Sequence, residues 1–277
     1  MNLLPPPIVQ APHGPLPVLL SVPHSGRDYA DWLVSLSRSG RKSLEPLEDP
    51  LVDRLVWRAL ARGPGAVIAQ APRAAVDCNR AEDEIDPSML RPPFGGRPTA
   101  RSRGGLGIVP SRTAAHGHLW LRPMRREDLE ARLDQAHRPY HSAIEQQLSL
   151  LLDRFGCALL LDCHSMPPTR GTPPIVFGDR HGRTAAPWVM AQALAIAAES
   201  GFDSSANDPF AGGHVIDRHW APNEGVHALQ VEVDRSFYLD PEGSPGSGFD
   251  RVAVLIESLA VRLGTALLDR RYATAAE

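Results

Sequence analysis

The stretch LLLDCHSM, residues 159–166, joins an apolar run that begins at Cys157 to side chains that carry chemistry. The leucines are typical of a buried strand in an α/β sheet. Asp162, Cys163 and His164 then place an acid, a thiol and an imidazole near the end of that strand. Because ligands bind outside the carboxyl ends of strands in open α/β sheets, this stretch predicts a buried strand that supplies part of a functional site.

Other segments extend this prediction to the whole chain. Four further short apolar runs, at residues 18–22, 66–69, 175–177 and 228–233, predict strands, and helical periodicity is present at 49–61, 140–152, 189–198 and 252–268. The alternation predicts an α/β fold of three layers, in which helices cover both faces of a mixed, mostly parallel central sheet. Without a repeat or a convincing linker, we expect a single domain over residues 1–277.

Composition narrows the class of partner. A net charge of −3 and a pI near 6.4 provide no broad positive field to attract nucleic acid or anionic lipid. The first 14 residues, MNLLPPPIVQAPHG, do not resemble a signal peptide, and no apolar run is long enough to span a bilayer. Three cysteines are too few for a disulfide framework. We therefore expect a cytoplasmic protein that binds a small molecule, with neither nucleic acid nor membrane as a partner.

One long segment, residues 87–112, is rich in proline, glycine and arginine and contains no acidic residue. A basic surface loop is one interpretation. Since long loops are often functional, a lid over an anionic substrate is the other.

A second imidazole and an acid are candidates for a metal site. His24 in SVPHSG follows the first predicted strand much as His164 follows the apolar run of residues 157–161, and two neutral imidazoles commonly begin a zinc site. Glu48 and Asp49 in LEDPLVDRL could supply a third ligand. Acids at this place are equally typical of helix capping, so both interpretations stay open.

Glu232 is an acid in the otherwise apolar strand ALQVEVD, where it shares a face with Gln230. A carboxylate there is costly unless it is paired, so it serves either a structural ion pair or general-base catalysis. A cysteine nucleophile is disfavoured, because Cys163 and His164 point to opposite faces of an extended chain.

Arg73, Asp77, Asn79 and Arg80 crowd into eight positions. The guanidinium fork of arginine suits a carboxylate, so this cluster favours an acidic small molecule; an arginine–aspartate surface network is the alternative. In HVIDRHW, we interpret His214 and His219 as residues on opposite sides of an extended chain, in a substrate loop or at the surface.

The motifs SVPHSG, EDPLVDRL, RAAVDCNR, LLLDCHSMP and HALQVEVDRSFYLD occur in an order that resembles the N-formylglutamate amidohydrolase family, from about Val18 to Asp240. The resemblance implies a zinc-exopeptidase-like fold, related to zinc carboxypeptidases and aspartoacylases, with one catalytic zinc. It further implies hydrolysis of an N-acyl amino acid, with N-formyl-L-glutamate of histidine catabolism as the first choice. Another N-acyl acidic amino acid or small peptide, or a non-catalytic protein that binds acidic ligands, is the alternative.

The resemblance also implies roles for individual residues. His24, His164 and Asp49 match the zinc ligands, with Glu48 as the alternative to Asp49, and Glu232 matches the general base. Asn79 and Arg80 match the pair that binds a substrate carboxylate. Arg73 and Arg235 are candidates for the cation that stabilises the oxyanion, and Arg235 is also a candidate for substrate binding.

Overall fold

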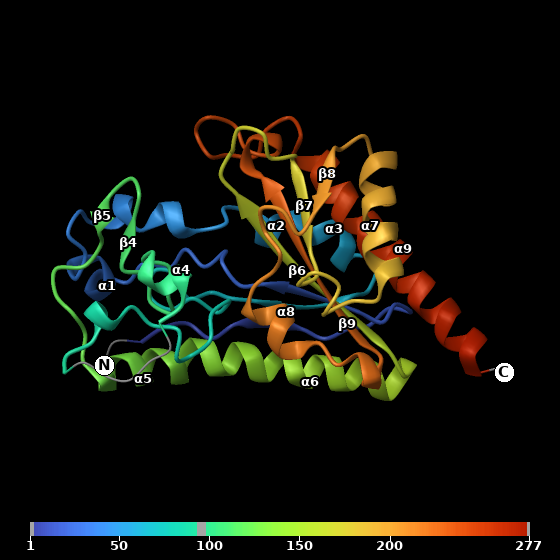
Figure 1. The fold of residues 1–277 in the computed structure, drawn as a ribbon, viewed down its shortest axis with the longest axis horizontal. Coiled ribbons are helices and arrows are strands. Elements are labelled where there is room, and N and C mark those ends of the chain that lie inside the picture. Colours follow the sequence, from blue (N-terminus) through green and yellow to red (C-terminus); the bar gives the residue numbers. More distant parts are fainter. Residues whose placement is uncertain (1–2, 93–97, 276–277) are drawn as a thin grey trace. The chain divides into compact units, whose positions relative to one another are not determined.

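In the computed structural model, which describes residues 3–92 and 98–275, seven strands form one sheet (Figure 1). Its strands are β1 (Ile8–Gln10), β2 (Val18–Val22), β3 (Gly65–Ile68), β6 (Ala158–Met166), β7 (Ile175–Gly178), β8 (Ser204–Ala206) and β9 (Val226–Asp234), in the order β1-β3-β2-β6-β9-β7-β8. The pairs β2–β6, β6–β9 and β7–β8 are parallel, whereas β7 and β9 are antiparallel. The predicted mixed, mostly parallel sheet is confirmed.

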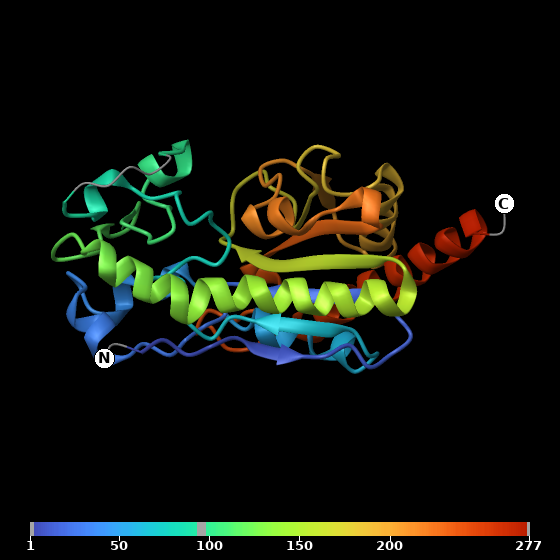
Figure 2. The same cartoon turned by 90° about the horizontal axis from the view of Figure 1, so that it is seen from below.

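Helices lie on both sides of this sheet (Figure 2). On one side α2 (Val52–Leu55), α3 (Trp57–Leu60) and α7 (Pro187–Glu199) contact α9 (Phe249–Ala275). On the other, α8 (His214–His219) packs on β6 and β9, and Arg218 in α8 is paired with Glu145 in α6 (Arg138–Phe155) at 3.0 Å. Within residues 3–92 and 98–275, each helix is too short or too polar to cross a membrane. The three-layer α/β/α prediction is therefore confirmed.

The chain divides into two compact units. Unit 2 consists of Val9–Val22, Asp49–Val67 and Ala143–Glu277 and contains nearly all of the sheet. Unit 1 consists of the chain up to Ile8, Pro23–Glu48 and Ile68–Ser142. It contains α1 (Asp31–Ser35), α4 (Ala100–Arg103), α5 (Arg126–Arg132) and a hairpin of β4 (Arg112–Thr113) and β5 (Gly117–His118). The expectation that both units form a single domain stays a prediction.

Unit 1 has its own hydrophobic core. Leu33, Leu44, Ile108 and Leu119 are fully buried in it, and they come from helices, turns and loops rather than from one sheet. Short 3₁₀ turns at Arg41–Ser43, Glu45–Leu47 and Pro87–Met89 and a π-helical turn at Leu133–His137 complete this unit. Two further 3₁₀ turns, Pro222–Glu224 and Arg235–Phe237, flank β9 in unit 2.

Some predicted elements differ from the observed ones. The helix predicted over 49–61 is two short helices, and Leu51, with a φ of 60°, precedes the first of them. His214 and His219 begin and end helix α8, so the prediction of an extended chain there was wrong. The predicted loop over 87–112 contains the 3₁₀ turn Pro87–Met89 and helix α4; its residues 93–97 lie outside the described residues, and its role as a lid stays a prediction.

Candidate active site

Polar side chains form an array across the carboxyl half of three neighbouring strands of unit 2. In the parallel register of β6 and β9, Asp162 is paired with Gln230 and His164 with Glu232. Ser21 on β2 is paired with Asp162 and donates from its hydroxyl to Asp162 Oδ1 over 2.6 Å. Gln230 donates to Glu232 Oε1 over 3.0 Å, which confirms that these two share a face. The strand period of two therefore places five polar groups on one side of an otherwise apolar sheet.

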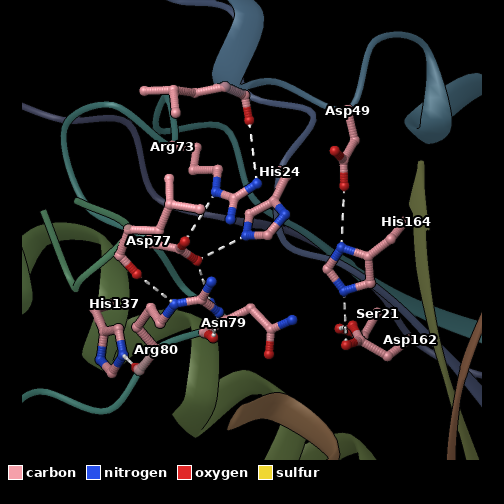
Figure 3. Close-up of polar contacts among 12 residues, drawn as sticks. Ser21, His24, Asp49, Arg73, Asp77, Asn79, Arg80, His137, Asp162 and His164 are labelled. Carbon is pink, nitrogen blue, oxygen red and sulfur yellow. Dashed lines mark hydrogen bonds and ion pairs between the residues drawn. The ribbon is translucent and has the colours of Figure 1, made fainter. Parts of the chain in front are cut away.

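His164 is held between two carboxylates (Figure 3). Its Nε2 lies 2.8 Å from Asp162 Oδ2, and its Nδ1 lies 3.0 Å from Asp49 Oδ2. Strand β6 continues to Met166, so His164 lies inside the strand rather than after its end. The extended backbone fixes Asp162 and His164 on the same face, two residues apart, which allows their bond.

Negative charge dominates the surroundings of His164. Asp49, Asp162 and Glu232 are all buried. Although burial alone would lower it, the pKa of His164 is held well above its ordinary value by Asp162, Asp49 and Glu232. Arg235 supplies a positive group, with Nη2 3.2 Å from Asp49 Oδ1 and Nε 3.2 Å from Ser165 Oγ.

The position of Asp49 is fixed by its own neighbours. Tyr238 donates from its hydroxyl to the carbonyl of Pro50 over 2.7 Å. Together with the bonds of Asp49 to His164 and Arg235, this contact ties the start of the Asp49–Val67 segment to the sheet of unit 2.

Asp77 organises the second cluster, which lies within unit 1 (Figure 3). His24 Nε2 lies 2.7 Å from Asp77 Oδ1, Arg73 donates from Nε to Asp77 Oδ2 over 2.8 Å, and the backbone N–H of Asn79 donates to Oδ1 over 2.8 Å. Burial alone would raise the pKa of Asp77, but Arg73, His24 and Arg80 hold it well below its ordinary value. Asp77 is thus an ionised anchor for His24.

Arg80 is almost completely buried beside this anchor. It donates from Nε to the carbonyl of Leu106 over 2.8 Å and from Nη1 to that of Asn79 over 2.7 Å. Burial lowers the pKa of Arg80, whereas Asp77 raises it. Arg80 and Asn79, predicted as a pair, therefore lie in the same unit as His24 and Arg73.

Glu48, the alternative to Asp49 as a ligand, lies in unit 1 beside Tyr29. Burial raises the pKa of Glu48, an effect that the hydrogen bond from Tyr29 opposes. The neighbouring acids thus have different partners, since the carboxylate of Asp49 contacts His164.

Cys163 has the environment of a structural residue. It is buried, and burial together with Asp162 raises the pKa of its thiol. A thiol that stays protonated at neutral pH is a poor nucleophile, so the environment of Cys163 also disfavours a cysteine mechanism.

Sequence reasoning gave no firm role to several residues that build the site. Asp77 contacts His24, and Asp162 contacts both His164 and Ser21. Tyr238 donates to the backbone carbonyl of Pro50, next to Asp49. The available signal was a polar residue inside an apolar run, as Ser21 is in VLLSV.

Fold and site together define a class of protein. An open α/β sheet with histidine and carboxylate side chains near the carboxyl ends of its strands is typical of enzymes that bind small ligands at that edge. His24, Asp49 and His164 each offer a ligand atom suited to a metal ion. The class is therefore an α/β enzyme with donor groups for a metal.

Comparison with known proteins gives the family. The model of a family described as N-formylglutamate amidohydrolase matches residues 16–239. The chain is 29% identical over 240 residues to the N-formylglutamate deformylase of Pseudomonas putida, covering 82% of this chain and 83% of that protein. Its counterpart from Pseudomonas aeruginosa is 28% identical over 250 residues, with 83% and 84% covered. The crystal structure of N-formylglutamate amidohydrolase from Ralstonia eutropha JMP134 matches with a TM-score of 0.86 at 28% identity, covering 96% of this chain and 99% of that one.

Since the family model covers most of its length, the chain belongs to the N-formylglutamate amidohydrolase family. This confirms the resemblance drawn from the motifs, and with it the predicted class of enzyme, an amidohydrolase that acts on a linear amide.

Proposed function

We propose that this protein hydrolyses N-formyl-L-glutamate to formate and L-glutamate in a zinc-dependent reaction. The family and the names of two curated relatives support the substrate. The proposal includes the predicted role in histidine catabolism and the predicted cytoplasmic location.

The main observation in favour of a bound metal ion is the concentration of negative charge around His164. Three buried carboxylates, those of Asp49, Asp162 and Glu232, act on this one imidazole, and Arg235 bonds Asp49. Buried charges are paired or coordinate metals, because an uncompensated charge in a protein interior is very costly. A divalent cation held by His164 and Asp49 would offset this excess of negative charge.

His24 completes the proposed ligand set. It follows Val22, the last residue of β2, by two positions, which is at most about 7 Å between Cα atoms. Strand β2 lies beside β6 in the sheet, so chain connectivity supports His24 as the second imidazole ligand. The bond of Asp49 to His164 supports Asp49 over Glu48 as the acidic ligand.

Each of the two imidazoles contacts a carboxylate through its Nε2 atom. Nε2 of His24 contacts Asp77, and Nε2 of His164 contacts Asp162. A carboxylate on one ring nitrogen fixes the tautomer and orients the other nitrogen toward a metal. Two imidazoles and one carboxylate are a ligand set of catalytic zinc sites, so the residues present fit this ion.

Zinc bound there would polarise the formyl carbonyl and make water a better nucleophile at neutral pH. Glu232 would accept the proton of the attacking water and deliver it to the departing amine. Asn79 and Arg80 would bind and orient the substrate carboxylate. Arg73 and Arg235 stay the candidates for oxyanion stabilisation, and the contact of Arg235 with Asp49 favours Arg235.

A substrate panel tests the activity. Purified protein is supplied with N-formyl-L-glutamate, N-acetyl-L-glutamate or N-formyl-L-methionine, and the released acid and amino acid are quantified. We expect the highest kcat/KM for N-formyl-L-glutamate. Faster cleavage of N-acetyl-L-glutamate would show that the preferred acyl group is acetyl rather than formyl. If all three compounds bind and none is cleaved, the result would favour a non-catalytic binding protein.

A further inference from the structure

Unit 1 contains a cavity of about 660 Å³ that the proposed reaction does not use. It lies among α1, residues 120–125, α5 and the π-helical turn that follows α5. Pockets for small organic ligands usually measure about 300–1,000 Å³. None of the candidate catalytic, substrate-binding or metal-binding residues is among the described residues that line it.

The lining is strongly basic. Arg91, Arg122, Arg125 and Arg132 line the cavity, and Asp128 is the acid among the described lining residues. Within the part of the chain that the structure describes, no ion pair involves any of these four arginines. The local excess of positive charge contrasts with the net charge of −3 on the whole chain. Such a concentration of arginine favours an anionic ligand, since the guanidinium fork matches a carboxylate.

Arg132 and two indoles form the base of the cavity. Arg132 is buried, and its guanidinium carbon lies 5.3 Å from the ring centre of Trp32 and 5.9 Å from that of Trp120. The Arg132 side chain donates to the carbonyl of Ala75 over 2.9 Å, and the indole of Trp120 donates to that of Pro110 over 2.6 Å. These contacts hold the guanidinium of Arg132 and the indole of Trp120 in place at the base of the cavity. By contrast, Arg91, Arg122 and Arg125 are exposed at its rim.

We propose that this cavity is a second binding site, for a small organic anion that has an apolar body and at least two carboxylate groups. The apolar body packs against the two indoles, and the rim arginines bind the carboxylates. A second carboxylate strengthens binding, because three arginines lie at the rim and each charge-assisted pair contributes separately. The site is independent of the proposed hydrolysis and of its metal.

Fluorine NMR of protein labelled with 5-fluorotryptophan tests the proposal. The chain has five tryptophans, so the Trp32 and Trp120 signals are assigned with the variants Trp32→Phe and Trp120→Phe. The probe is benzene-1,3-dicarboxylate, whose carboxylates are too far apart to chelate one metal ion, titrated at constant ionic strength. We expect saturable shifts of the Trp32 and Trp120 signals, with the other three signals unchanged, and weaker binding of benzoate.

Paired variants separate a built site from general charge attraction. Arg122→Gln/Arg125→Gln removes two exposed rim charges and should weaken binding by about tenfold or more. The control Arg154→Gln/Arg271→Gln removes two exposed charges in unit 2 and should leave the affinity unchanged. Absence of saturable shifts, or equal weakening in both double variants, would overturn the proposal.

Discussion

Glu232 occupies the position opposite His164 in the paired strands β6 and β9, and its carboxylate is buried. If it moves the proton, Glu232→Gln should lower kcat by roughly 10²–10⁴-fold, the usual contribution of general acid–base catalysis. Zinc content should stay at the wild-type level, because Glu232 is not a proposed ligand. Formate release and metal analysis measure both quantities.

A matched control for this variant is Glu224→Gln, which changes an exposed glutamate just before β9. It should retain wild-type kcat. Normal turnover in Glu232→Gln would remove Glu232 from the role of base.

Arg80 is a buried cation that donates hydrogen bonds to the backbone carbonyls of Leu106 and Asn79. If its remaining donors bind the substrate carboxylate, Arg80→Lys should raise KM by about tenfold or more, because lysine lacks the planar fork. The change in kcat should be smaller than the change in KM. Steady-state kinetics with N-formyl-L-glutamate checks this split, and an unchanged KM would exclude Arg80 from the carboxylate site.

Single residues of the site differed in how well they could be predicted. His24, His164 and Glu232 stood out because each interrupts an apolar run or follows one closely, whereas Asp49 became the first choice over Glu48 through the family resemblance. The partnership of His24 with Asp77 spans 53 positions in the sequence, and no periodic pattern encodes such a bond. Partners of this kind depend on how loops fold back, which local sequence does not reveal.

At the scale of elements, the turn after β2 depends on Gly26. A Cβ atom on this residue would run into the carbonyl of Ala71 and the carbonyl oxygen of Gln70, which are backbone groups that cannot rotate away. Gly26→Ala should therefore displace the chain two residues after His24 and destabilise the protein by about 1–3 kcal/mol, as overpacking does. Urea unfolding gives the free energy change, and wild-type stability with wild-type kcat/KM would contradict the role assigned to this turn.

Asp86 joins the turn Pro87–Met89 to Ser111. It accepts from Ser111 Oγ over 2.6 Å and from Ser88 N over 2.9 Å. Burial alone would raise the pKa of Asp86, but these bonds and Arg112 bring it below its ordinary value. A lowered folded pKa means that Asp86 stabilises the protein above its unfolded pKa, about 3.9, and that this stabilisation is lost as the pH falls through the folded pKa.

The variant Asp86→Asn should thus lower the free energy of unfolding by about 1–3 kcal/mol at pH 7. The difference from wild type should shrink as the pH falls below about 4, where the carboxylate becomes protonated. Urea unfolding of both proteins across this pH range provides the test. A difference that is constant with pH would show that the charge of Asp86 contributes nothing.

Regular elements with long patterns were the easiest to predict. Strand β2 matches its predicted range of 18–22, and α6, α7 and α9 extend beyond their predicted ranges at both ends, α9 as far as Ala275. Strand β6 runs five residues past Leu161, because β9 pairs with it as far as Met166, whereas its pairing with β2 ends at Asp162. The helix predicted over 49–61 starts only at Val52, after the left-handed residue Leu51, and it is interrupted at Val56, which separates α2 from α3.

At the scale of the whole molecule, the α/β sheet was predictable from alternating strands and helices, whereas unit 1 was not. Its core draws on three separate segments of the chain, and its helices other than the start of α6 are seven residues or shorter. Such short elements carry no sustained periodicity, so they read as loops in the sequence. Family membership then gave what neither pattern nor geometry alone provides, the class of reaction.

We propose that hydrolysis of N-formyl-L-glutamate by this protein depends on a metal ion held by His24, Asp49 and His164. The most direct test measures formate release by one preparation as purified, after chelation and dialysis, and after the return of one equivalent of zinc. We expect release to fall to background on chelation and to recover with zinc. Full release by protein that contains no metal would show that the reaction does not depend on the metal.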